Sequence, residues 1–154
     1  MFPIGLAILC LNTPICTLLS CDPDLEQAIR VLPGQAERFC RKYCLFIFAI
    51  NSIVACIYLC SWQLINGGTG FVHGITLLLF ALQSAILSVI LEWKRPIRGW
   101  KTESDLWHHP RKYLVPLIML LAAALVGIWP PALWIWAAAL LTECCVLLVV
   151  TRRE

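Results

Sequence analysis

Charged residues are scarce in this chain. They make up 14% of its 154 residues, whereas 60% are hydrophobic. A soluble domain has about 25% charged residues, and a chain with so few cannot cover a water-facing surface. The composition therefore excludes an ordinary soluble domain and predicts an integral membrane protein. The length of the chain suggests a single domain.

Several signatures of catalysis and metal binding are missing. The sequence has no CxxC pair, no His/Cys spacing typical of zinc sites, no glycine-rich phosphate loop and no catalytic triad. Its one long polar segment between apolar runs, residues 92–112, is too short to fold as a catalytic domain. We expect no enzyme activity, and no metal or cofactor bound by this chain alone. The positive charge lies near apolar runs, which predicts membrane edges rather than nucleic-acid binding.

Four long apolar runs have the length of transmembrane helices. A hydrocarbon core about 30 Å thick requires roughly 17–25 helical residues, and a helix satisfies its own backbone hydrogen bonds in lipid. The expected helices cover residues 43–65, 71–91, 113–129 and 132–150.

The positions of the basic residues predict how these helices are oriented. Bases precede the first run, lie between the second and third, and follow the fourth, whereas the turns at 66–70 and 130–131 have no charge. Short turns place consecutive helices side by side, and basic segments stay in the cytosol. We therefore expect an all-α, integral membrane four-helix bundle of two antiparallel transmembrane hairpins, with the basic loop and the C-terminus cytosolic.

Residues 1–42 form an N-terminal extension to the membrane domain at 43–154. The first 21 residues are apolar but are interrupted by prolines, so they form either a fifth helix or a segment in the membrane interface. We favour the interfacial or partly inserted alternative. A short cytosolic-side helix should follow, capped by Asp22, with Leu25, Ile29 and Leu32 on one face.

Polar residues inside the apolar runs are candidates for function, because polar groups are costly in a bilayer. They include Asn51, His73, Gln83 and Glu143. Glu143 could transfer protons or ions, or it could form an interhelical hydrogen bond to Asn51, to Gln83 or to a partner subunit, which we favour. His73 could bind haem, but no other predicted span has a histidine to pair with it. We therefore place it at headgroup level beside the glycine-rich turn.

The nine cysteines do not form an obvious disulfide framework. Five lie inside apolar runs, where a free thiol behaves as a small hydrophobe. Cys40 and Cys44 flank the basic pair Arg41 and Lys42, which makes them candidates for reversible S-palmitoylation. The alternative is that they pack at the membrane edge.

Three segments resemble a known family in their order. SVILEWKRPIRG (88–99) closes the second run with a glutamate, an aromatic residue and bases; PRKYLVPLIMLLAAAL (110–125) re-enters the membrane; and TECCVLLVVTRRE (142–154) closes the fourth run. This order resembles the small partner subunit of NADPH oxidase cytochrome b, the light-chain (alpha-subunit) family with its fungal NoxD-type relatives. The similarity covers residues 43–154 in pattern more than in identity.

The resemblance implies a non-catalytic subunit that stabilises and helps to mature the large catalytic subunit of a superoxide-generating NADPH oxidase. Haem and FAD would then lie on that partner, in a membrane heterodimer located in the endoplasmic reticulum, the secretory pathway or the plasma membrane. The residues expected to orient the bundle and contact the partner are Glu92, Trp93, Lys94, Arg95, Pro96 and Arg98.

Two other functions fit parts of the pattern. Golgi and endoplasmic-reticulum proteins of vesicle traffic or cargo exit share the four-span layout and a glutamate after the second helix. A small transporter or channel that uses Glu143 is the third alternative, although transporters usually have repeats or broken helices around a midplane site.

Overall fold

A computed structural model describes residues 2–11, 15–32, 34–68, 70–99, 105 and 108–152. Every element in these ranges is helical, as the sequence predicts. Three helices are long and apolar enough to cross a membrane: Gln35–Asn66, Phe71–Lys94 and Pro110–Ile128; a shorter apolar helix covers Ala132–Leu147. The described part of the chain is therefore all-helical, and its long apolar helices are those of a membrane protein.

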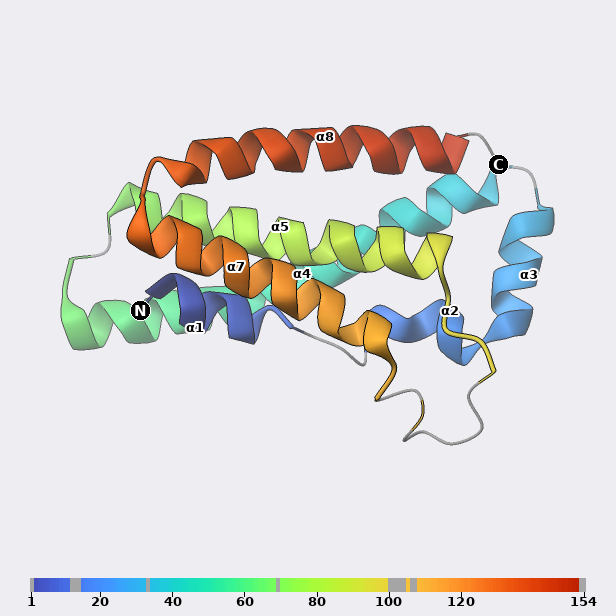
Figure 1. The fold of residues 1–154 in the computed structure, drawn as a ribbon, viewed down its shortest axis with the longest axis horizontal. Coiled ribbons are helices and arrows are strands. Elements are labelled where there is room, and N and C mark those ends of the chain that lie inside the picture. The colour runs from blue at the N-terminus through green and yellow to red at the C-terminus, as the bar shows by residue number, and fades with distance from the viewer. Residues whose placement is uncertain are drawn as a thin grey trace.

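The two longest helices, α4 (Gln35–Asn66) and α5 (Phe71–Lys94), lie side by side (Figure 1). Their ends match the predicted runs closely, except that α4 begins about two turns before residue 43. Gly34 and Gly67 flank α4 with positive φ angles of 73° and 64°, a conformation that glycine adopts without a steric penalty. The bases at the start of α4 are thus helical and continue the membrane helix beyond its apolar part.

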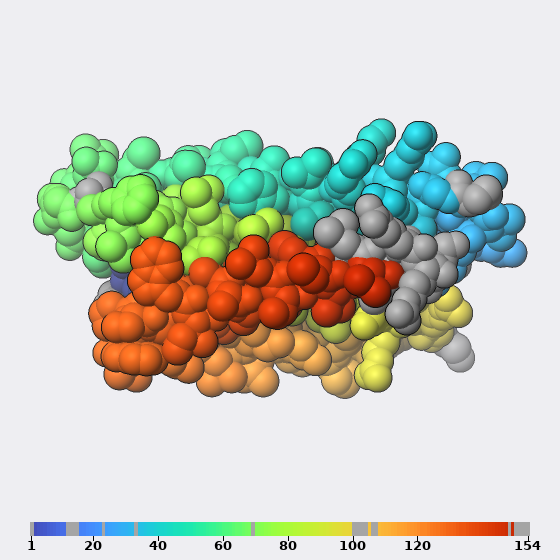
Figure 2. Space-filling view, turned by 90° about the horizontal axis from the view of Figure 1, so that it is seen from above, coloured from blue at the N-terminus to red at the C-terminus, as the bar shows by residue number. Residues whose placement is uncertain are grey.

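A 3₁₀ turn, η2 (Pro110–Tyr113), leads into α7 (Leu114–Ile128), and α8 (Ala132–Arg152) follows. Figure 2 shows α8 along the length of the molecule, with α4 and α5 on one side and α7 on the other. α8 contacts α5, α4 and α7, and part of its surface stays exposed, including Leu141 and Val149.

The N-terminal segment forms α1 (Phe2–Leu9), η1 (Ile15–Thr17), α2 (Leu18–Cys21) and α3 (Pro23–Val31). α1 contacts α7, α4 and α5, and its Leu6 and Ala7 are fully buried. A side chain at Gly5 would collide with the ring of Tyr58, so the helices approach closely there. α1 has eight residues, fewer than the roughly 17 of a spanning helix; it packs inside the bundle, and its depth in the membrane stays a prediction.

The predicted surface helix after residue 21 is confirmed. The Asp22 carboxylate accepts a hydrogen bond from the backbone N–H of Leu25 at 3.0 Å, which satisfies an N–H group left unpaired at the helix start. Ile29 is buried and Leu25 is half-buried, whereas Leu32 is exposed and follows the last helical residue, Val31. The predicted face is therefore buried only in part. This short helix closes the basic end of the bundle.

Candidate functional site

Buried charges gather where α5 ends, at the start of the polar segment 92–112. We call this cluster the polar junction. Its members come from α2, α3, the end of α5, the segment after it and η2: Ser20, Glu26, Arg30, Glu92, Trp93, Arg98 and Arg111.

Glu92 lies at the centre of the polar junction, with a fully buried side chain. Its Oε1 accepts a hydrogen bond from the backbone N–H of Ser20 at 2.6 Å, and its Oε2 forms an ion pair with the Arg111 guanidinium. Arg111 also donates to the backbone carbonyl of Arg95, and its side chain is 11% exposed. A buried carboxylate requires such partners, because its desolvation would otherwise cost several kcal/mol. This pair connects the end of α5 to the start of the next helix.

A second ionic group surrounds the buried Glu26. Its Oε1 accepts from Arg30 Nε at 2.9 Å and from Arg98 Nη2 at 2.8 Å. Arg30 also lies over the ring of Trp93, 4.5 Å from its centroid, and donates to the Trp93 carbonyl at 2.7 Å. The guanidinium therefore combines an ion pair, a cation–π contact and a hydrogen bond. These contacts fasten α3 to the end of α5.

Ser20 on α2 binds two parts of the chain around the end of α5. Its N–H binds Glu92, and its hydroxyl oxygen accepts from the backbone N–H of Ile97 at 2.8 Å. Ser20 thus contacts both the last turn of α5, through Glu92, and the segment that follows α5, through Ile97. The polar junction satisfies its carboxylates internally, which suits it to fix helices rather than to exchange protons.

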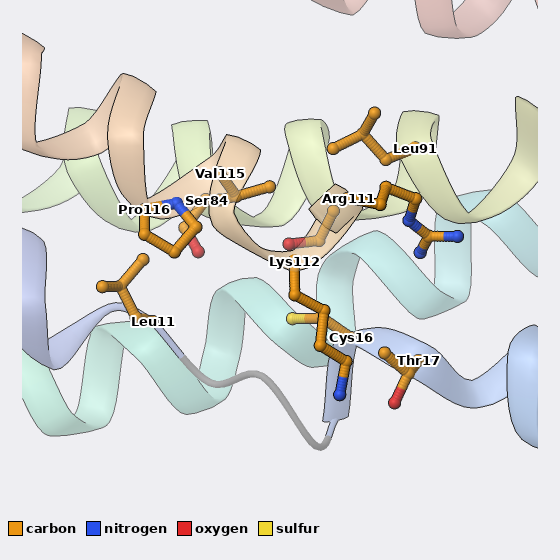
Figure 3. Close-up of a pocket in the computed structure, with 10 residues that line it drawn as sticks. Leu11, Cys16, Thr17, Ser84, Leu91, Arg111, Lys112, Val115 and Pro116 are labelled. Carbon is orange, nitrogen blue, oxygen red and sulfur yellow. The ribbon is translucent and has the colours of Figure 1, made fainter. Parts of the chain in front are cut away.

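Two cavities border the polar junction. The first, shown in Figure 3, has a volume of about 40 Å³ and is lined in part by Cys16, Ser84, Arg111 and Lys112, which leaves room for a few water molecules. Burial raises the pKa of the Cys16 thiol, and a hydrogen bond with Ser88 partly offsets this effect. The second cavity, of about 630 Å³, lies against Glu26 and its two arginines.

The structure divides the predicted junction residues into two sets. Glu92 and Trp93 are buried within the chain, so their observed contacts are internal. Lys94 and Arg95 are exposed and Pro96 is half-buried. The side chain of Arg98 is 72% exposed although it pairs with Glu26.

The sequence interpretation did not identify Ser20, Glu26, Arg30 or Arg111 as site residues. One signal was available for Arg111. Two consecutive membrane helices joined by one loop have their loop ends at the same face of the bundle, so opposite charges at those ends can pair. The spacing of Glu26 and Arg30, four residues apart on one helix, was also a signal for their ion pair. The contacts of Ser20 with Glu92 and of Glu26 with Arg98 had no such signal, because each joins residues 72 positions apart.

The intramembrane polar candidates lie on three helices. Gln83 Nε2 on α5 donates a hydrogen bond to Glu143 Oε2 on α8, so one of the two internal partners expected for Glu143 is found. Gln83 is fully buried and Glu143 half-buried. Asn51 on α4 is also fully buried. This hydrogen bond fixes α8 against α5 in the apolar part of the bundle.

His73 and the two lipidation candidates lie in different environments. His73 Nδ1 accepts from the backbone N–H of Gly70 at 3.3 Å, and its ring meets the Phe2 ring edge-on at 4.7 Å. It thus caps α5 beside the glycine-rich turn. Cys40 is 2% exposed, and Cys44 is half-buried; burial of the Cys40 thiol disfavours its acylation in this conformation.

Within the described ranges, no group of three or more His, Cys, Asp or Glu side chains could hold a metal ion. All nine cysteines are free thiols. Comparisons with known protein families, curated proteins and solved structures found no match to this chain.

Proposed function

We propose that this chain is a non-catalytic membrane subunit that spans the bilayer four times, as two antiparallel hairpins, and stabilises a larger membrane partner. The partner is the haem- and flavin-bearing subunit of a superoxide-generating NADPH oxidase. The order of the segments 88–99, 110–125 and 142–154 supports the choice of partner. The proposed location is the endoplasmic reticulum and the secretory pathway, with the basic end in the cytosol.

One structural observation supports the non-catalytic role most directly. Both carboxylates of the polar junction are buried and bound to arginines, and Glu92 also to a backbone N–H. Groups held in this way stabilise a conformation, whereas a general acid or base must reach a substrate proton. The polar junction thus gives a rigid end to the bundle, from which Lys94 and Arg95 face outward.

Purification from native membranes tests this proposal. The tagged chain, solubilised in mild detergent, should capture a haem-bearing membrane protein with a flavin domain, visible by its haem absorbance and by mass spectrometry. Deletion of the chain should abolish superoxide production. Capture without any haem protein, in repeated preparations, would overturn the oxidase proposal.

A matched pair of charge reversals refines the test. Arg95→Glu changes an exposed base beside the polar junction, and Lys42→Glu changes an exposed base on α4. Like charges across an interface weaken binding strongly, so Arg95→Glu should reduce capture at least several-fold, whereas Lys42→Glu should not. Equal effects would show that Arg95 has no special role in binding.

The vesicle-traffic function is the alternative, because its four-span layout fits the same helices. It predicts capture of secretory cargo and a sorting defect on deletion, with superoxide production unchanged. The deletion phenotype therefore separates the two functions directly.

A further inference from the structure

An apolar groove lies between α4, α5 and α8, and none of its lining residues belongs to the polar junction. Its volume is about 230 Å³, and its lining is almost entirely apolar. The lining residues are Glu37, Cys40, Arg41, Cys44 and Leu45 on α4, Leu82 and Ile86 on α5, and Cys144 and Leu147 on α8. Ligand pockets usually measure about 300–1,000 Å³, so this groove suits part of a flexible chain rather than a whole compact ligand.

The direction of the groove follows from its residues on α4. Glu37, Cys40, Arg41, Cys44 and Leu45 are spaced as one helix face, which extends roughly 12 Å along the axis. The face is charged at one end and apolar at the other, and it crosses from the basic part of α4 into its apolar part. The groove therefore begins at the membrane edge and continues toward the hydrocarbon core.

Positive charge surrounds the entrance. Arg41 lines it, and Arg38 lies one turn earlier on the same side of α4; both are exposed, and neither has an ion pair or hydrogen bond within the described residues. Glu37 is the one carboxylate in the lining and is half-buried. Among the described residues at the entrance, the two arginines outnumber this carboxylate, so their net charge is positive.

We infer that this groove binds one acyl chain of an anionic phospholipid, whose headgroup phosphate lies on Arg38 and Arg41. The apolar walls match the acyl chain, and the unpaired arginines match the negative headgroup. This site is independent of the partner subunit, since it requires only that α4, α5 and α8 lie in a bilayer.

Photocrosslinking tests the inference on the full chain in nanodiscs. The probes are phosphatidylserine and phosphatidylcholine with a diazirine on one acyl chain. Peptide mapping should place phosphatidylserine crosslinks on the groove residues Leu82, Ile86 and Leu147 in preference to lipid-facing positions outside the groove. Phosphatidylcholine should crosslink there much less, whereas an even distribution for both probes would overturn the inference.

Two pairs of variants test the walls and the entrance separately. Leu82→Trp should fill the groove and remove its crosslinks, whereas Leu78→Trp, one turn away on an exposed part of α5, should leave them. Each base near a membrane surface contributes about 1 kcal/mol, so R38Q/R41Q should lower the preference for phosphatidylserine roughly 30-fold. K94Q/R95Q removes the same charge elsewhere and should not change it.

Covalent lipidation is the competing source of an acyl chain. A palmitoyl thioester on Cys44 would increase the intact mass and be removed by hydroxylamine. If that modification occupies the groove and phosphatidylserine crosslinks are absent, the phospholipid inference is wrong. An unmodified Cys44 together with groove crosslinks supports it.

Discussion

Removal of the Glu92 carboxylate should destabilise the protein more than any change to an exposed charge. In Glu92→Leu, the nearly buried Arg111 loses its counter-ion and the Ser20 N–H loses its acceptor. Breaking a buried ion pair by removing one partner costs about 3–5 kcal/mol. For a chain of 154 residues, 1 kcal/mol corresponds to roughly 2–4 °C in melting temperature, so the expected loss is on the order of 10 °C.

The assay is thermal unfolding of the purified protein in detergent, followed by far-UV circular dichroism. Asp24→Asn is the control, because Asp24 is exposed in the first turn of α3; it should change the melting temperature by no more than a few degrees. E92L/R111L completes a double-mutant cycle and should be more stable than the sum of the single losses predicts. Additive losses, or a Glu92→Leu effect as small as that of the control, would refute the proposed role of the pair.

Three further predictions concern other parts of the chain. Glu143→Gln retains an acceptor for Gln83 and should leave both stability and ion flux in vesicles unchanged. Glu143→Leu removes the acceptor and should lower the free energy of unfolding by on the order of 1 kcal/mol. A loss of ion flux in Glu143→Gln would instead indicate transport. Burial raises the pKa of the Cys16 thiol, and the thiolate is the form that reacts. Alkylation of Cys16, measured by mass spectrometry, should therefore begin at higher pH in the folded protein than in the denatured chain. A glycosylation acceptor inserted at residues 66–70 should be modified, and one inserted within residues 92–112 should not; the reverse pattern would invert the proposed topology.

The sequence predicts the helices well because their signals are local. Apolar runs and the uncharged turns define α5, α7 and α8 within a few residues, and Asp22 marks the start of α3 as expected. The start of α4 at Gln35 was missed because a basic stretch beside a membrane helix is equally compatible with helix and with loop. The packing of α1 was missed because an apolar segment does not indicate which neighbour it contacts.

The site was predicted only in part, for a related reason. Glu92 was identified through the family resemblance of segment 88–99, in which it closes an apolar run. Its burial depends on Ser20 and Arg111, which approach it only in the folded chain. The hydrogen bond of Glu143 was easier to anticipate, because a carboxylate in an apolar helix has few possible partners and Gln83 is one of them. A polar side chain inside the apolar bundle has few possible hydrogen-bond partners, so its partner can be predicted. A polar side chain at the end of the bundle has many possible partners, so its partner cannot.

The position of α1 has a consequence for the order of assembly during translation. α1 leaves the ribosome early, but its most extensive contacts are with α7, which is synthesised roughly a hundred residues later. At about 5–20 residues per second, Leu6 and Ala7 wait roughly 5–20 s for Met119, Ala122 and Ala123 of α7, which complete the cluster that buries them. α1 can therefore complete its packing only after α7 is made, and it needs protection by lipid or by a chaperone in the meantime.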